Sequence, residues 1–392
     1  MAVLLLLVFA LPAAAQEAGT HHHHEEAMPA GWTWSADANL FFGFNAQVRK
    51  LTPFQAWESQ NWWMLAGEHA VGRGRLTLVG MASLEPFTIA GQGSPQLFQT
   101  GEIYKQIPIV NFQHPHDLLM GLGGTYRLPA GRVVLIAGAD LVGNPTLGPV
   151  PFMHRESGRD DPEAPLTHHW LDSTHATPGV VRAGVAIGGI TLEASGFRGA
   201  EPDDNHLNIE RPRIDSWAAR ANWARGPWSA QFSGGHLKQP ESFEPYDVTR
   251  WTASLSYDGT AASRPLAVTA AWGGNREFNG FNGNNDGYLA EGRLRLTDMS
   301  TLYTRAEGVD KELFGLGFHP RGLSHRHTYY RVYALTAGYI RDLPLVKRTR
   351  IGIGADITGY RMPDDLAVIY GGSMSYHVFL RWRPEGGKKH EM

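Results

Sequence analysis

The chain has 392 residues, a formal net charge of −3 and no cysteine. A near-neutral charge excludes a dedicated nucleic-acid-binding protein, which carries a basic excess, so we expect no nucleic-acid partner. The absence of cysteine excludes disulfide scaffolds and cysteine-ligated zinc. Glycine and aromatic residues are abundant, and the mean hydropathy of −0.28 excludes a helical membrane protein.

Residues 1–15 predict an export signal. Val3 to Leu11 is an apolar run too short to span a bilayer, and Ala13 to Ala15 offers a small-residue cleavage site. A buried N-terminal strand is the alternative. Residues 16–31 would then form a His-rich periplasmic tail, in which His21 to His24 either bind a divalent metal, remain solvated, or represent a purification tag.

Apolar and polar residues alternate with period 2 along most of the chain. In Trp32 to Ala46 the even positions are apolar, and polar residues such as Asp37 and Asn39 lie between them, as in a strand with one apolar face. We count sixteen segments of this kind. They lie near 32–48, 61–69, 75–84, 117–126, 132–142, 179–187, 190–198, 215–224, 227–236, 248–257, 265–274, 287–297, 300–309, 329–341, 346–358 and 373–383.

The connectors between these segments alternate in length. Gly188–Gly189 and Arg225–Gly226 are short, whereas Glu85–His116 and Gly143–Pro178 are long. Strands of about ten residues with short turns at one end and long loops at the other are typical of bacterial outer-membrane proteins. The sequence therefore predicts an all-β fold, a transmembrane antiparallel β-barrel of about 16 strands over residues 32–383. We expect short periplasmic turns, long extracellular loops and a polar C-terminal tail at 384–392; a secreted sandwich or propeller is the alternative.

The two faces of the predicted strands differ in chemistry. Lipid supplies no hydrogen bonds to backbone groups, so only a closed sheet is stable there, and its charged face must line a wet lumen. The inner face carries Asp37, Asp140, Arg182, Glu193, Arg220, Arg250, Glu291, Arg293, Arg295, Arg305, Glu307, Asp356 and Arg381. The outer face carries aromatic residues that suit the headgroup region: Trp32, Trp34, Trp217, Trp223, Trp228, Trp251, Tyr257, Trp272, Tyr288, Tyr376 and Trp382. We therefore expect a Gram-negative outer-membrane protein in contact with outer-membrane lipid.

Six histidines in two long connectors begin at the same rim of the predicted barrel. They are His114, His116, His154, His168, His169 and His175. With acidic neighbours they are suitable ligands for copper, zinc or nickel, although their spacing matches no known metal motif. Those acidic neighbours are Asp117, Asp160, Asp161, Glu163 and Asp172. Two other interpretations compete: a loop folded into the lumen as a constriction, and a hydrolase with Ser173 as nucleophile, His175 or His168 as base and Asp172 as orienting group.

Part of the second connector resembles a known family. The strings Met153 to Arg155, Pro162 to Pro165, His168 to Trp170 and Asp172 to His175 resemble an uncharacterised family of bacterial outer-membrane β-barrel proteins associated with copper and heavy-metal resistance genes. The resemblance covers about Asn111 to Glu201. The resemblance implies a barrel protein associated with metal handling. It implies no reaction and no catalytic residue for this chain.

Together these features predict a non-enzymatic, porin-like protein for passage or binding of a small solute. A metal ion or metal complex is one candidate solute. The sequence establishes no cofactor, and a divalent transition metal (copper, zinc or nickel) is the one candidate. We expect the connectors Glu85–His116 and Gly143–Pro178 to narrow the lumen. An outer-membrane hydrolase and a structural or adhesive surface protein are the alternatives, and the sequence predicts no oligomeric state.

Overall fold

The computed structural model describes residues 31–50, 52–241, 246–277, 283–312 and 329–385. The predicted export signal, most of the predicted periplasmic tail including His21 to His24, and residues 386–392 lie outside the described residues. Within the described part of the chain, no helix is long and apolar enough to cross a membrane.

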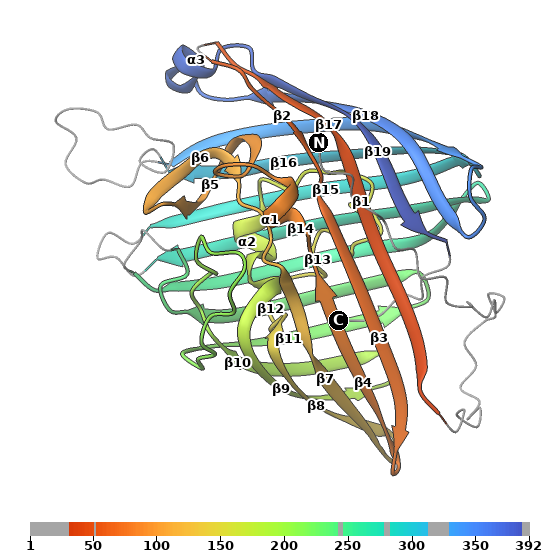
Figure 1. The fold of residues 1–392 in the computed structure, drawn as a ribbon. Coiled ribbons are helices and arrows are strands. Elements are labelled where there is room, and N and C mark those ends of the chain that lie inside the picture. Colours follow the sequence, from red (N-terminus) through yellow and green to blue (C-terminus); the bar gives the residue numbers. More distant parts are fainter. Residues whose placement is uncertain (1–30, 51, 242–245, 278–282, 313–328, 386–392) are drawn as a thin grey trace.

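Seventeen strands of the described residues form one antiparallel sheet that closes on itself (Figure 1). Closure occurs where the first and last strands pair, from Leu40 opposite Trp382 to Val48 opposite Met374. The strands of this sheet are β1 (Thr33–Val48), β2 (Phe54–Glu58), β3 (Asn61–Val71), β4 (Gly74–Ala82), β7 (Leu119–Ala130), β8 (Val133–Gly143), β9 (Thr177–Ile187), β10 (Ile190–Phe197), β11 (Ser216–Arg225), β12 (Trp228–Leu237), β13 (Val248–Ala261), β14 (Arg264–Glu277), β15 (Asn284–Thr297), β16 (Ser300–Glu312), β17 (Tyr329–Leu343), β18 (Thr349–Arg361) and β19 (Met374–Pro384).

Strands β2 and β3 share one position in the wall. Residues Gly43–Gln47 of β1 pair with β2, and Thr33–Leu40 of the same strand pair with β3. Counting these two as one interrupted strand leaves sixteen wall positions out of the seventeen strands. The prediction of a closed antiparallel barrel of about 16 strands is confirmed, and each predicted segment overlaps one wall strand.

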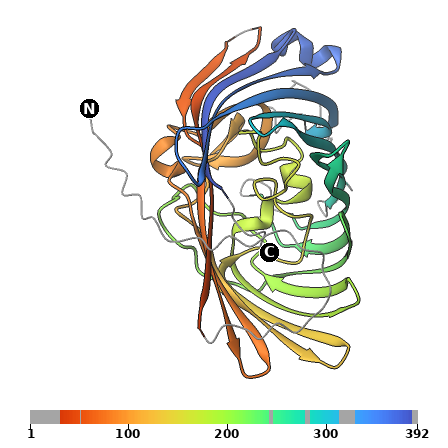
Figure 2. The same cartoon turned by 90° about the vertical axis from the view of Figure 1, so that its right-hand side faces the viewer.

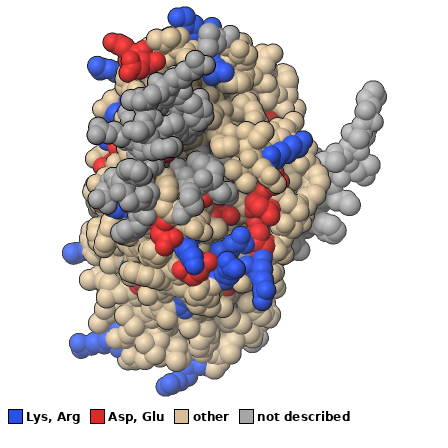
Figure 3. Space-filling view, turned by 90° about the vertical axis from the view of Figure 1, so that its left-hand side faces the viewer, with Lys and Arg blue, Asp and Glu red and all other residues tan. Residues whose placement is uncertain are grey.

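The two ends of the barrel differ as predicted. At one end, tight turns join strand pairs such as β9–β10 at Gly188–Gly189, where both glycines have positive φ. At the other end lie the long connections, with helix α3 (Asp364–Tyr370) between β18 and β19. Figure 3 shows that acidic and basic side chains lie side by side near the centre of this long-loop end.

The predicted faces are confirmed. Each charged wall residue predicted to face inward is buried or half-buried, whereas aliphatic side chains such as Leu192, Leu255 and Leu335 are about half exposed on the outside. Trp34 and Trp217 are also exposed on this outer face. The barrel therefore has a charged interior and an apolar exterior, which is the arrangement that lipid requires.

The connector Glu85–His116 contains secondary structure that sequence reasoning missed. It holds a short helix, α1 (Glu85–Thr88), and a separate hairpin of β5 (Ser94–Tyr104) and β6 (Ile107–Gln113). Phe98 and Asn111 have φ near +67°, and the register of the hairpin shifts twice. Those irregularities remove the strict period-2 pattern, so the alternation of apolar and polar residues predicts no strand here.

Candidate functional site

Residues 144–176, which join β8 to β9, run inside the barrel; we call this segment the lumen loop. Figure 2 shows it within the ring of strands. It includes the helix α2 (His168–Leu171) and the 3-10 turn η1 (Ser173–Ala176). Almost every residue from Pro145 to Asp172 is buried. The expectation that this segment folds into the lumen is confirmed.

Asp160 is the main point of attachment between the lumen loop and the wall. Its carboxylate pairs with Arg381, with Arg293 Nε at 2.5 Å and with Arg383 Nη1 at 3.3 Å. The three arginines hold the pKa of Asp160 well below its usual range, although burial alone would raise it. Because the arginines lie on β15 and β19, one loop residue joins two separated parts of the wall.

A second ionic network attaches the loop to β15 and β16. Arg155 donates to Glu291 Oε1 at 2.7 Å and to Asp172 Oδ2 at 2.9 Å. Asp161 pairs with Arg305 at 3.0 Å, and Arg305 also reaches Glu291 at 3.3 Å. These pairs are almost completely buried, so removing one partner leaves an uncompensated charge, at a cost of about 3–5 kcal/mol.

Apolar packing holds α2 in place, and glycines in the wall leave room for it. Trp170 packs with Leu97 and Phe98 of the β5–β6 hairpin and with Val309 of the wall. A side chain added at Gly273 of β14 would collide with the Trp170 backbone, and one at Gly287 of β15 would touch its ring. The helix therefore lies directly against two wall strands at positions that lack side chains.

The structure brings together some of the six histidines proposed as metal ligands. The rings of His116 and His168 each lie 5.2 Å from the ring of His175, between centroids, and all three rings surround Phe152. The other three point elsewhere: His114 lies beside His206, His154 against Trp62, and His169 toward two glutamates.

Each ring of the central group has its Nδ1 atom held by an oxygen. His116 contacts Glu85 Oε2, His168 contacts Asp172 Oδ1, and His175 contacts the Asp172 carbonyl, each at 2.8 Å. Burial lowers the pKa of His168 below 6.5 and the pKa of His175 well below 6.5, so these two rings are neutral at pH 7. An oxygen on Nδ1 leaves Nε2 as the lone-pair nitrogen, which is the usual state of a ligating histidine.

The acidic residues proposed as partners are used in ion pairs with the protein itself. Asp160 and Asp161 pair with wall arginines, Glu163 lies 3.2 Å from His377 Nε2, and Asp117 lies 2.8 Å from His206 Nδ1. Their main contribution is therefore to hold the loops in place.

The hydrolase alternative does not have the required geometry. The Ser173 hydroxyl accepts a hydrogen bond from Arg250 at 3.0 Å, and the Asp172 carboxylate is bound by Arg155 and His168. His175 bonds the backbone of Asp172 rather than its carboxylate. A nucleophile–base–acid relay through Ser173 is therefore not formed within the described residues.

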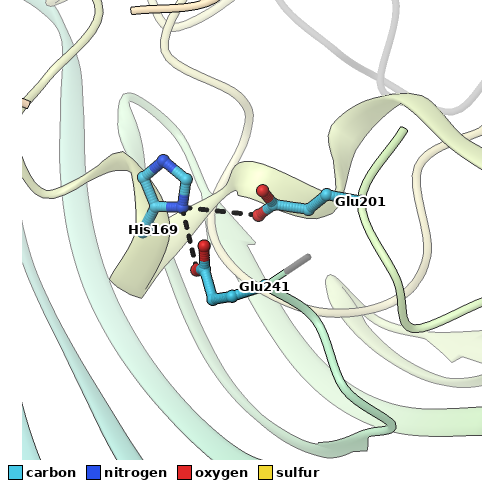
Figure 4. A group of neighbouring side chains, drawn as sticks. All are labelled: His169, Glu201 and Glu241. Carbon is cyan, nitrogen blue, oxygen red and sulfur yellow. Dashed lines mark hydrogen bonds and ion pairs between the residues drawn. The ribbon is translucent and has the colours of Figure 1, made fainter. Parts of the chain in front are cut away.

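Sequence reasoning missed three acidic residues that surround these histidines. Glu85 holds His116, while Glu201 Oε1 and Glu241 Oε1 lie 3.4 and 3.2 Å from His169 Nδ1 (Figure 4). Both of the latter glutamates follow strands that end at the rim where the lumen loop begins. The argument that placed the histidines at one rim applies equally to acidic side chains, and it would have found them.

A cavity of about 50 Å³ remains between the lumen loop, the β5–β6 hairpin and the wall. Its lining includes His114, His116, Phe152 and Arg159. This volume holds only a few water molecules, so the two connectors together leave little open space here. The expectation that both connectors narrow the lumen is supported by this packing.

Comparison with solved structures gives distant matches over nearly the whole chain. An anion-selective porin from Comamonas acidovorans superimposes with a TM-score of 0.51 and 11% identity, over 90% of this chain and 100% of that chain. OprB of Pseudomonas putida gives 0.54 and 8%, over 91% and 94%. OmpF of Salmonella typhi, in complex with daunomycin, gives 0.54 and 7%, over 89% and 97%.

No family model matches the chain, and neither does any of the curated proteins. The resemblance to a family linked with metal-resistance genes therefore stays a prediction. What the structural matches show is the fold: a closed, porin-like, 16-stranded antiparallel barrel.

Proposed function

We propose that the protein is a porin-like channel of the Gram-negative outer membrane that passes small water-soluble solutes through a lumen constricted by the lumen loop. One observation carries the proposal: the loop lies inside a closed barrel and is tied by ion pairs to the wall strands β15 and β19. The apolar outer face and charged inner face support a lipid-embedded wall around an aqueous path.

Conductance in planar lipid bilayers tests this proposal. The refolded protein should give small, discrete conductance steps. Asp160→Asn removes the negative charge that Arg293, Arg381 and Arg383 share, so the loop should loosen and the conductance should increase at least twofold. If neither protein conducts although both are correctly folded, the channel proposal is wrong and the barrel is sealed.

We also propose that divalent transition-metal ions interact with this path. The support is the group of His116, His168 and His175, whose Nδ1 atoms are each held by an oxygen in the manner of metal-binding histidines. Copper, zinc and nickel prefer imidazole ligands, whereas magnesium prefers oxygen.

Block of the single-channel current tests the interaction with metals. Ni²⁺ should reduce the conductance of the natural protein more than Mg²⁺ does at the same concentration. The His168→Ala protein should lose this difference, because one of the three imidazoles is gone. If the two ions reduce the conductance of the natural protein equally, the proposed interaction with transition metals is wrong and only metal-independent passage remains.

A further inference from the structure

We infer that His169, Glu201 and Glu241 form a zinc-type metal site that joins the lumen loop to two neighbouring connections at the long-loop end. The three residues come from different segments: α2, the connection after β10 and the connection after β12. The inference does not rest on channel function, because a barrel that conducts nothing can still bind zinc here.

The geometry of the three side chains fits a tetrahedral ion. One ligand atom from each lies within 4.8 Å of the others, and His169 Nδ1 is 3.4 Å from Glu201 and 3.2 Å from Glu241 (Figure 4). In a tetrahedral zinc site with ligand distances of about 2.0–2.1 Å, neighbouring ligand atoms lie about 3.3 Å apart. The two separations from His169 match those edges, and the third, between the two glutamate oxygens, is no more than 4.8 Å.

The site is buried, which distinguishes it from ordinary acidic groups on a surface. His169 is 4% exposed and Glu201 7% exposed, and the Glu241 side chain is 14% exposed. Two carboxylates brought this close out of water repel each other, and such charges are expected to be paired or to coordinate a metal.

Two cations, Arg250 and Lys311, lie near these carboxylates. Arg250 acts on both through space, but its guanidinium donates to Asn275 at 2.9 Å and to Ser173 at 3.0 Å. Lys311 acts on Glu241, and its ammonium donates to Gln99 at 3.2 Å. A proton on His169 Nδ1 supplies one charge to two carboxylates, whereas a divalent ion in its place supplies two and contacts all three ligands.

The donor set favours zinc. One imidazole and two carboxylates are borderline ligands, and zinc accepts both kinds in a four-coordinate site with room for water. The site shares no residue with the group of His116, His168 and His175, so a substitution in that group leaves all three proposed zinc ligands in place.

Zinc binding to the folded full chain tests the inference. The background protein carries His21→Ser, His22→Ser, His23→Ser, His24→Ser and His175→Ala, because the histidines of the tail and of the group around His175 could bind metal themselves. Isothermal titration in detergent should give one zinc per chain, and cobalt should give the visible absorption of a tetrahedral site. Glu201→Gln and Glu241→Gln should each weaken zinc binding at least tenfold, since each replaces an anionic ligand with a neutral amide of nearly the same shape.

Glu210→Gln is the matched control, because Glu210 lies in the same connection as Glu201 but does not belong to the three-residue group. It should retain zinc affinity within about twofold. The temperature at which each barrel unfolds in an SDS gel shift assay confirms that all variants are folded before titration. Zinc should raise that temperature in the background protein and in Glu210→Gln, and not in Glu201→Gln or Glu241→Gln. Unchanged affinity in both Glu201→Gln and Glu241→Gln, or no binding by the background protein, would overturn the inference and leave a histidine–carboxylate ion pair.

Discussion

At the scale of single residues, the two faces of each wall strand impose opposite demands. Along β11, Trp217, Ala219 and Ala221 are exposed on the outside, whereas Arg220 and Asn222 point to the lumen. Arg220 lies 3.5 Å from Glu193 of the adjacent strand. The same substitution should therefore affect the stability of the barrel very differently on the lipid face and on the lumen face of one strand.

Ala219→Arg should destabilise the barrel by about 2–4 kcal/mol, the cost of placing arginine near the middle of the lipid face. Asn222→Arg introduces the same side chain on the lumen face of the same strand, where Glu193 Oε2 already lies 3.4 Å from the amide. That variant should change stability little. Urea unfolding in lipid vesicles measures both, and equal losses would show that the face assignment is wrong.

Buried histidines should make the lumen loop sensitive to acid. Burial and the nearby charges of Arg159 and His116 lower the pKa of His154 to about 3, and burial also lowers the pKa of His168 and His175. Below pH 6.5 these histidines bind protons when the lumen loop leaves its packed position, but not while the loop is packed inside the barrel. Its packing should therefore weaken as pH falls from about 6.5 toward 3, by about 1 kcal/mol per pH unit for His154, and His168 and His175 act in the same direction.

Asp161 opposes this trend, because burial raises its pKa to about 7 and packing gains stability as pH falls from 7 to 3.8. His169 acts in the same direction as Asp161, because Glu201 and Glu241 raise its pKa although burial alone would lower it. The test is therefore confined to residues 150–158, which contain His154. Hydrogen exchange of residues 150–158, corrected for intrinsic rates, should show faster opening at pH 5.5 than at pH 7.5. His154→Gln should reduce that difference; an identical pH dependence in the variant would exclude His154 as a contributor.

At the scale of elements, α2 is held by contact with wall backbone rather than by its own length. It has only four residues, and it presses on Gly273 and Gly287 of β14 and β15. Trp170 Nε1 also donates to Asn285 Oδ1 at 2.5 Å. Its position therefore depends on the absence of side chains at those two wall positions.

Gly273→Ala should displace α2 at a cost of about 1–3 kcal/mol, because the new methyl group overlaps the Trp170 backbone. The displaced loop should exchange amide hydrogens faster over residues 165–175. Gly359→Ala is the control, since a methyl group there has no heavy atom within 4 Å. Similar exchange in both variants would mean that α2 does not depend on the glycine contact.

At the scale of the whole molecule, the difference between the barrel ends predicts orientation. Leu207 is 57% exposed in the connection between β10 and β11, at the long-loop end. Asp298 is fully exposed in the turn between β15 and β16, at the opposite end. An N-terminus on the periplasmic side places the first position outside the cell and the second in the periplasm.

Because the chain has no cysteine, single-cysteine variants report this orientation directly. A bulky maleimide that cannot pass the pore should label Leu207→Cys on intact cells and Asp298→Cys only after the outer membrane is permeabilised. The opposite pattern would reverse the orientation, and labelling of both on intact cells would contradict a membrane-embedded barrel.

The sequence by itself determined the wall of this protein. Strand number, the two faces and the alternation of short and long connections could all be read from a period-2 pattern, because each depends on neighbours two residues apart and on a uniform lipid environment. Even Asp37 and Arg381, on the first and last wall strands, were correctly placed on the inner face.

Only the tertiary structure decided what fills the lumen. Arg381 and Asp160 are 221 residues apart, and Glu163 reaches Gln47 at 2.6 Å across 116 residues. Such contacts have no period, and a charged side chain in a sequence does not reveal which opposite charge it will meet. The six histidines show the same limit: a shared rim follows from strand order, but which rings meet and which turn toward Glu201 and Glu241 depends on how the loop packs inside the closed wall.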